Sequence, residues 1–319
     1  MSGLWKLRFS MFGTLSVIIG LSTLFFAGVL YMTGISFMVL PFIIVAFNIG
    51  QWLFAPRLID AMYRVKEVSR SDNPELYETV ERLSKKSGIK MPRVMLAKIP
   101  LPNAFAYGSP IAGTRVAVTK GLLETLEAEE VEAVIGHELG HLKHKDVQVM
   151  MFVSLLPALF YAIGLSMLFS SRTGRGGRSG GAAIIGIASI ILYWVLTLFT
   201  LYLSRLREYY ADRHSAMIVE DGPRKLSEGL AKIVRSTGRM KKHRRGTSGS
   251  SSLKSLFITD PDRADLDATS IRKAGVYSTD RKLVEDVLRR KITTLDRVME
   301  FFSTHPNIVK RLKALQELA

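Results

Sequence analysis

Long uninterrupted apolar segments constrain this chain more than any other feature of its sequence. A helix needs about 20 consecutive apolar residues to cross the hydrocarbon core of a bilayer. Four segments have this length and contain no Lys, Arg, Asp or Glu: residues 11–33, 35–55, 147–169 and 182–204. Buried core helices of a large soluble protein are the alternative, but four charge-free segments of this length favour four transmembrane helices.

The composition agrees with a chain divided between lipid and water. Hydrophobic residues make up 48% of the 319 residues, yet the formal net charge is +16, and Lys and Arg crowd the stretches between the apolar segments. Nucleic-acid binding would also explain a basic chain, but no nucleic-acid-binding motif accompanies the charge. We therefore expect a lipid bilayer with anionic headgroups, and no nucleic acid, as the partner of the basic residues.

The predicted transmembrane helices form two pairs. The first pair lies in residues 1–55 and follows Lys6 and Arg8, as a signal peptide would, but no obvious small-residue cleavage site follows, so we keep it in the mature chain. The second pair, residues 147–204, is joined by a Gly-rich external loop at 171–181. Lys and Arg near the other span ends favour a multi-pass cell-membrane protein with both termini on the cytoplasmic side.

The polar segments, residues 56–146 and 205–319, would share the cytoplasmic side and fold together as one domain. The second segment contains a basic, Ser-rich stretch at 238–252, for which we expect a mobile surface loop, with a lipid-headgroup contact as the alternative.

The first polar segment mixes helix and strand signals. Asn73 followed by Pro74 predicts the start of an amphipathic helix that ends at Gly88. Residues 93–97 and 115–119 show the β-branched alternation of strands around a turn-rich segment. Residues 127–145 return to helical character and lead into the third apolar segment.

The sequence His137-Glu138-Leu139-Gly140-His141 forms an HExxH pattern inside this last predicted helix. Residues four apart lie on one helix face, so both imidazoles can reach one zinc ion while Glu138 points toward water beside it. The chain has no cysteine, so any metal must be held by His, Asp or Glu. The pattern therefore predicts one catalytic Zn²⁺ per chain.

A catalytic zinc site needs a third protein ligand and one open position. We expect Glu208 to be that ligand, because it follows the fourth apolar segment as closely as the HExxH pattern precedes the third. Asp212 lies one turn farther on the same face. It is expected to hydrogen-bond His137 and orient its ring without binding the metal itself. An ion pair of Glu208 with Arg205 or Lys143 is the alternative.

Two other histidines compete for the ligand role. His144 could face the metal, but the second histidine of the pattern normally takes that direction alone. His214 lies six residues beyond Glu208, on roughly the opposite helix face, and is expected to be a surface or packing residue.

The chemistry predicted for this set is peptide hydrolysis. Glu138 would take a proton from the attacking water and pass it to the departing amine. His305 is the candidate donor to the developing oxyanion, with Arg311 as a weaker candidate. A histidine before proline, as in His305-Pro306, is also typical of a cap or turn.

Four stretches resemble the HtpX-type integral-membrane zinc metallopeptidases and, more distantly, the membrane CaaX prenyl proteases: residues 102–106, 136–146, 204–216 and 303–312. Their order, with the two pairs of apolar segments, covers nearly the whole chain. The resemblance implies a mainly α membrane protein with four transmembrane helices and an α+β zincin-like cytoplasmic catalytic domain with a small edge β-sheet. It also implies polypeptide substrates, namely misfolded or damaged membrane proteins, in stress-linked quality control.

The resemblance further implies that Asn103, Ala104, Phe105 and Ala106 belong to an edge strand along the cleft, where a substrate could add as an extended strand. An ordinary turn is the alternative. The basic loop at 238–252 departs from the family pattern, and the sequence carries no pattern that predicts an oligomeric state.

Three other functions are weighed against this one. An intramembrane protease of the site-two type would carry HExxH inside a span, but the helix at 127–145 is too polar to cross lipid. A CaaX prenyl protease would be expected to have more than four spans. A non-catalytic membrane scaffold would not need the complete set of ligands and base.

Overall fold

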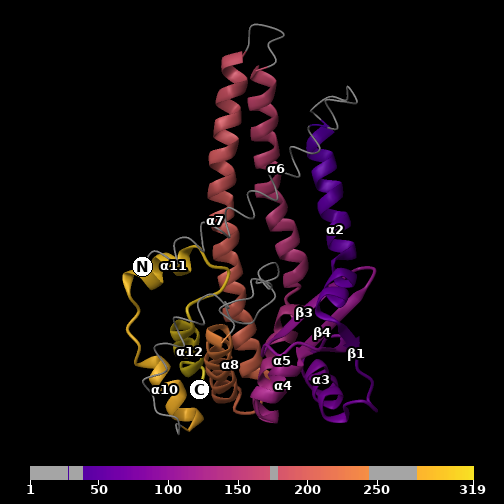
Figure 1. Cartoon of the computed structure of the whole chain (residues 1–319), viewed down its shortest axis with the longest axis vertical. Helices are drawn as coiled ribbons and strands as arrows, with labels where there is room; N and C mark the ends of the chain where they lie inside the picture. The colour runs from indigo at the N-terminus through magenta and orange to yellow at the C-terminus, as the bar shows by residue number, and fades with distance from the viewer. Residues whose placement is uncertain (1–27, 29–38, 173–178, 244–278) are drawn as a thin grey trace. The chain divides into compact units, whose positions relative to one another are not determined.

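The computed structural model describes residue 28 and residues 39–172, 179–243 and 279–319 (Figure 1). The first expected span, residues 11–33, lies outside the described residues except for Gly28. The chain packs as two compact units. We call Met1–Trp52 with Val149–Leu201 the apolar unit, and Leu53–Gln148 with Tyr202–Ala319 the polar unit.

Three helices of the described residues are long and apolar enough to cross a membrane: α2 (Leu40–Tyr63), α6 (Asp146–Arg172) and α7 (Ser179–Ile218). Helix α2 continues through Pro56, so the expected end of the second span at residue 55 is too early for the helix. Helix α7 runs unbroken for 40 residues. Its charged residues begin at Arg205, so its lipid-compatible part ends at Ser204.

Small residues set the packing of α6 and α7 within the apolar unit. A Cβ atom added at Gly164 would lie 3.0 Å from the carbonyl oxygen of Gly186, and one added at Gly186 would lie 3.0 Å from the carbonyl oxygen of Gly164. Glycines let transmembrane helices approach closely enough for extensive van der Waals contact. These two positions therefore fix how α6 and α7 meet.

The polar unit contains a four-stranded sheet with the order β1-β2-β4-β3. Its strands are β1 (Val65–Glu67), β2 (Arg93–Ala97), β3 (Ala104–Ser109) and β4 (Gly113–Thr119). Strand β2 runs parallel to β4, and the other two pairs are antiparallel. Strands β2 and β4 lie where the sequence predicts them, but the turn-rich segment between them forms β3, the last strand in the sheet order.

The helix between β1 and β2 and the two helices that follow β4 pack against this sheet (Figure 1). Helix α3 (Pro74–Ser87) begins at Asn73, whose side chain accepts the Leu76 N–H, and ends at Gly88 with φ +64°, as predicted. The other helices are α4 (Lys120–Thr125), α5 (Ala128–Lys143), α8 (Gly222–His243), α10 (Asp280–Leu288), α11 (Thr294–Phe301) and α12 (Ile308–Gln316).

The core of the polar unit is built from helices that lie far apart in the sequence. Leu83 of α3, Leu139 of α5, Leu230 of α8 and Leu312 of α12 are all fully buried in one cluster. The burial of these leucines ties the first polar segment to the second, and α5 and the residues of α7 from Tyr202 onward belong to one compact unit.

One expectation for the second polar segment is wrong in part. Residues 238–243 form the last turns of α8 and not a loop. The basic and small residues of the whole segment suggest a loop. Lys and Arg are nevertheless good helix formers, so the helix formed by the preceding residues extends into the start of the segment. The rest of the expected loop, residues 244–252, lies outside the described residues. Both ends of the expected external loop, residues 171–172 and 179–181, are helical, since α6 reaches Arg172 and α7 begins at Ser179.

Candidate active site

The close approach of α5 to α7 brings the HExxH pattern and Glu208 together. A Cβ atom added at Gly140 would lie 3.0 Å from Cα of Ala211, and one added at Gly136 would lie 3.0 Å from Oγ of Ser215. The Ser215 hydroxyl also donates a hydrogen bond of 2.6 Å to the carbonyl oxygen of Ala133. Small residues on both helices thus allow backbone contact along the stretch that carries the predicted ligands.

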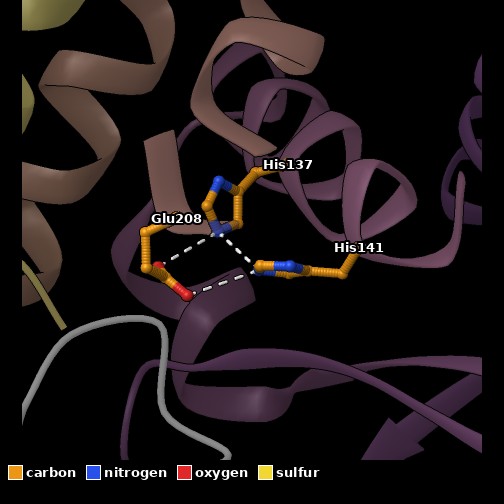
Figure 2. Close-up of side chains that lie close together, drawn as sticks. All are labelled: His137, His141 and Glu208. Atoms are coloured by element: carbon orange, nitrogen blue, oxygen red, sulfur yellow. Dashed lines mark hydrogen bonds and ion pairs between the residues drawn. The ribbon is translucent and has the colours of Figure 1, made fainter. Parts of the chain in front are cut away.

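Three predicted ligands converge on one point (Figure 2). His137 Nε2 lies 3.2 Å from His141 Nε2, and Glu208 carboxylate oxygens lie 3.6 Å from each of these nitrogens. His137 and Glu208 are buried, and His141 is partly buried. The ligand atoms all lie within 4.8 Å of one another.

These distances fit a tetrahedral metal site. Metal–nitrogen and metal–oxygen bonds of about 2.0–2.1 Å place the ligand atoms of a tetrahedral zinc roughly 3.3 Å apart. The 3.2 Å separation of the two imidazole nitrogens is close to that spacing, and each nitrogen lies 3.6 Å from a different carboxylate oxygen of Glu208. Two imidazoles and one carboxylate supply three ligands and leave a fourth position for water or substrate.

Asp212 and Arg311 are a buried ion pair that contacts His137 and Glu208. Asp212 Oδ1 lies 2.9 Å from His137 Nδ1. The guanidinium of Arg311 donates to both carboxylate oxygens of Asp212, at 2.8 Å and 2.6 Å, and its Nη1 lies 3.2 Å from Glu208 Oε2. Such a fork fixes both carboxylates at once. The structure therefore brings Asp212 to the side of His137 that faces away from the ligand cluster.

The charges around this ion pair shift the pKa of each acid. Burial alone would raise the pKa of Glu208, but His305, His137, Arg311 and His141 outweigh burial and hold it well below its usual value. Burial is likewise outweighed at Asp212, where Arg311 and His137 lower the pKa. Both groups are therefore carboxylates at neutral pH, as metal binding and imidazole orientation require.

Asp146 is a site residue that the sequence reasoning missed. Its Oδ2 lies 2.6 Å from His141 Nδ1, so each ligand imidazole has its own carboxylate. The chain turns sharply between α5 and α6 at Lys145, which has φ +56°, and this turn places Asp146 beside His141. An aspartate five residues after the second histidine is a visible signal, but helical spacing alone does not predict the turn.

Glu138 lies beside the ligands and is held by the sheet. It is buried, and the backbone N–H of Ala106 on β3 hydrogen-bonds to its carboxylate. Burial raises its pKa, although the two histidines and this N–H act in the opposite direction. A buried carboxylate with a raised pKa is suited to taking up and releasing a proton.

The stretch Asn103–Ala106 lies at the start of the edge strand. Ala104 pairs with Val118 of β4, whereas Asn103 precedes the strand and its N–H donates to Thr119 Oγ1 at 2.9 Å. Phe105 is buried against the ring of Tyr107, and both side chains lie on the face of the sheet opposite to that of Ala104 and Ala106. Among the described strands, none pairs with β3 on the side away from β4.

His305 also lies at the site, although farther from Glu208 than His137 and His141 are. It is buried, its Nε2 is 3.9 Å from Glu208 Oε1, and its Nδ1 is 3.0 Å from Thr304 Oγ1. Arg311, the weaker candidate for an oxyanion donor, has its guanidinium engaged with Asp212 and Glu208 instead.

The competing histidines lie together outside the ligand cluster. His144 is exposed, and its ring is 6.0 Å from that of His214. His214 Nε2 lies 2.9 Å from Ser87 Oγ, and burial together with nearby His144 and Lys143 lowers its pKa to about 4. Neither histidine belongs to the one group of three possible metal ligands found in the described part of the chain.

Comparisons with known proteins agree with this arrangement. The profile described as Peptidase family M48 matches residues 70–319. The chain is 39% identical over 287 residues to a protein named Protease HtpX homolog from Thermoplasma acidophilum, covering 88% of this chain and 85% of that relative. A relative of the same name from Aeropyrum pernix is 39% identical over 293 residues, 90% of this chain and 88% of its own length.

A solved structure resembles the fold. The crystal structure of S. mikatae Ste24p matches with a TM-score of 0.56 and 15% sequence identity, covering 99% of this chain and 67% of that one. The profile match, the two relatives and the apolar helices lead to one conclusion. This chain is a membrane metallopeptidase that belongs to peptidase family M48.

Proposed function

We propose that this metallopeptidase is a zinc-dependent endopeptidase that cleaves misfolded or damaged membrane proteins in stress-linked quality control. The observation that carries the proposal is the convergence of His137, His141 and Glu208, whose ligand atoms lie within 4.8 Å of one another beside the buried Glu138. The names of the HtpX relatives support proteolysis as the activity.

Zinc is the metal that the ligand set favours. Imidazole nitrogen with one carboxylate oxygen is typical of catalytic zinc sites with an open position, whereas Mg²⁺ and Ca²⁺ prefer oxygen ligands alone. A bound zinc ion supplies Lewis acidity, which lowers the pKa of water and polarises a carbonyl group. One Zn²⁺ per chain satisfies the three ligands.

The proton transfers fall to Glu138. Its carboxylate accepts a proton from the attacking water and delivers it to the amine that leaves the scissile bond. The Ala106 N–H holds this carboxylate in place, so the general base is positioned by the strand that borders the site. His141 Nδ1 is hydrogen-bonded to Asp146, and His137 Nδ1 lies 2.9 Å from Asp212 Oδ1, so each Nδ1 faces a carboxylate and each Nε2 is left to bind metal.

His305 is the proposed donor to the oxyanion. Its Nε2 lies on the Glu208 side of the ligand cluster, and a protonated or neutral imidazole there can stabilise negative charge on the carbonyl oxygen. Arg311 supports the site through Asp212 and Glu208, because its guanidinium is committed to these two carboxylates.

An extended substrate would bind along β3. Among the strands that the structure describes, none pairs with β3 on the side away from β4, so a polypeptide can add there as a further strand next to Ala106 and Glu138. Backbone recognition tolerates many side chains, as expected of an enzyme that degrades damaged proteins of varied sequence.

The polar unit is proposed to lie in the cytoplasm, below four transmembrane helices of the cell membrane. Three of these helices are α2, α6 and the apolar part of α7, and the fourth is the expected span at residues 11–33. The excess of Lys and Arg next to the span ends supports this orientation.

The test compares zinc content and casein cleavage in detergent for the wild type, Glu138→Gln and Glu208→Ala. Glu138→Gln is expected to keep zinc and lose cleavage by several orders of magnitude, whereas Glu208→Ala is expected to lose most of its zinc. Glu129→Gln serves as the matched control, because Glu129 lies on the same helix α5 in an exposed ion pair with Arg224. Full cleavage by the zinc-loaded Glu138→Gln protein would rule out this mechanism.

A further inference from the structure

Helix α11 carries an apolar face that points away from the core. Leu295, Val298 and Phe301 are 38%, 38% and 49% exposed, and they follow one another at intervals of three residues. Asp296, Met299 and Glu300 are buried on the opposite face. Residues three apart lie on one side of a helix, so the exposed apolar side chains form a continuous stripe.

Helix α11 is short, but its first turn is stabilised by a capping box and an ion pair. Thr293 accepts the Asp296 N–H, and the Asp296 carboxylate accepts the Thr293 N–H, which closes a capping box at its start. Arg290 pairs with Asp296 at 2.9 Å. The apolar stripe is therefore presented by an ordered element.

The position of the other end of α11 indicates what covers the stripe. Arg205 Nη1 donates to the carbonyl oxygens of Glu300, Phe301 and Ser303 at 2.9, 3.1 and 2.7 Å. Arg205 is also the first charged residue after the apolar part of α7. The last turn of α11 and the turn after it are thus hydrogen-bonded to the first charged residue after the apolar stretch of α7.

The residues around this attachment are of the kind found at a membrane surface. The Arg205 guanidinium lies 5.7 Å from the ring of Tyr202, which is exposed. Tyrosine and arginine at the end of an apolar helix are typical of the interface between lipid and water. Exposed basic side chains lie on and just before α11: Arg289, Lys291 and Arg297. Their charge complements anionic headgroups.

We propose that α11 lies in the lipid–water interface of the bilayer, with Leu295, Val298 and Phe301 against the acyl chains and the basic side chains among the headgroups. Arg205 links the end of α11 to the residue that follows the apolar part of α7, and the chemistry of the stripe matches that of interfacial amphipathic helices. A bilayer is thereby the occupant of this face.

The contact has a consequence for the site. The Glu300 carboxylate accepts the Asn307 N–H at 3.1 Å, and the Ser303 hydroxyl accepts the His305 N–H at 3.2 Å. Glu300 and Ser303 are also bonded through their carbonyl oxygens to Arg205. Lipid contact by α11 therefore steadies the turn that carries His305.

The absence of cysteine makes a direct test possible, since a single introduced cysteine carries a nitroxide label at one position. Leu295→Cys and Phe301→Cys are labelled in the full-length, zinc-loaded protein in vesicles of phosphatidylcholine and phosphatidylglycerol. Met217→Cys is the matched control, because Met217 is an apolar residue, 75% exposed, on α7. It lies 12 residues beyond Arg205, or about 18 Å along the helix axis.

The measurement is the ratio of collision rates with oxygen, which enters lipid, to those with a water-soluble chromium oxalate complex. We expect this ratio to be several-fold higher at residues 295 and 301 than at 217. Equal ratios at all three positions would place α11 in water and overturn the proposal. Shielding of residues 295 and 301 from both reagents would also overturn it, because it would mean that protein covers the stripe. Neither result depends on zinc or cleavage, so the proposed function is tested separately.

Discussion

At the scale of single residues, each of the two imidazoles proposed as metal ligands lies beside its own carboxylate. Asp212 lies 2.9 Å from His137 Nδ1, and Asp146 lies 2.6 Å from His141 Nδ1. A carboxylate in this position fixes the imidazole tautomer and its ring orientation, and it raises the basicity of the nitrogen that binds the metal. The two carboxylates are positioned by different elements: Asp212 lies on α7, and Asp146 is placed by the turn between α5 and α6.

Asp146→Asn is expected to lower zinc affinity by about 10- to 100-fold, because an amide orients His141 without contributing negative charge. The affinity is measured by competition with a chromogenic chelator. Asp280→Asn is the control, since Asp280 is paired with Lys232 on a different part of the polar unit. Unchanged affinity in Asp146→Asn would show that His141 needs no partner.

Zinc affinity is expected to rise with pH. Burial lowers the pKa of His137, but the carboxylates of Asp212 and Glu208 outweigh burial and raise it to about 9 in the metal-free protein. Because zinc binds the neutral imidazole, a proton must leave at every pH below this pKa, and affinity should increase about tenfold per pH unit between neutral pH and the pKa. Calorimetry in buffers of different ionisation enthalpy should show proton release on binding. Zinc binding at neutral pH without proton release would contradict this.

At the scale of elements, the site depends on how closely α5 approaches α7. Gly140 meets Cα of Ala211, and this contact lies between His137 and His141 on one side and Glu208 and Asp212 on the other. The spacing of these residues along each helix is visible in the sequence. Their meeting across two helices could be expected from the adjacent spans, but the glycine contacts that set the separation could not.

Gly140→Ala is expected to destabilise the protein by about 1–3 kcal/mol, because the new Cβ would lie 3.0 Å from backbone of α7. It should also reduce zinc content, since the shift of α5 separates the imidazoles from Glu208. Gly229→Ala on α8 is the matched control. Its Cβ meets ordinary contacts at 3.5 Å or more, so this change should be neutral or stabilising by about 0.4–1 kcal/mol. Chemical unfolding and metal analysis of both variants check the pair, and equal stability of the two would contradict the expectation.

The sheet shows where sequence reasoning reached its limit. The alternation of β-branched residues predicts β2 and β4 correctly. In strand β3, Phe105 and Tyr107 favour strand, but Ala104, Ala106 and Gly108 do not, so the segment lacks a clear strand pattern. The strand forms because its backbone pairs with β4 and because the Tyr107 hydroxyl donates to Asp60 at 2.6 Å. Both are tertiary contacts.

At the scale of the whole molecule, the chain interleaves two units in sequence. The membrane segments 1–52 and 149–201 alternate with the polar segments 53–148 and 202–319. Charge-free length predicts apolar helices where the structure describes them, since α6 and α7 contain the third and fourth expected spans and α2 overlaps the second. Helix ends are predicted less well, because Pro56 follows the expected end of the second span but α2 continues through it to Tyr63.

The proposed orientation predicts which positions face the cytoplasm. In the cysteine-free chain, Arg175→Cys in the expected external loop should react with a membrane-impermeant maleimide in intact cells. Lys90→Cys, exposed in the polar unit, should react only after the membrane is permeabilised. Labelling of Lys90→Cys in intact cells would place the polar unit outside.

The central claim is that two imidazoles and one carboxylate bind a single zinc ion. Zinc-edge X-ray absorption on the loaded wild type tests it most directly. The account predicts two imidazole nitrogens and oxygen ligands at about 2.0–2.2 Å, and loss of the bound zinc in Glu208→Ala. A shell with three imidazoles, or an unchanged shell in Glu208→Ala, would contradict it.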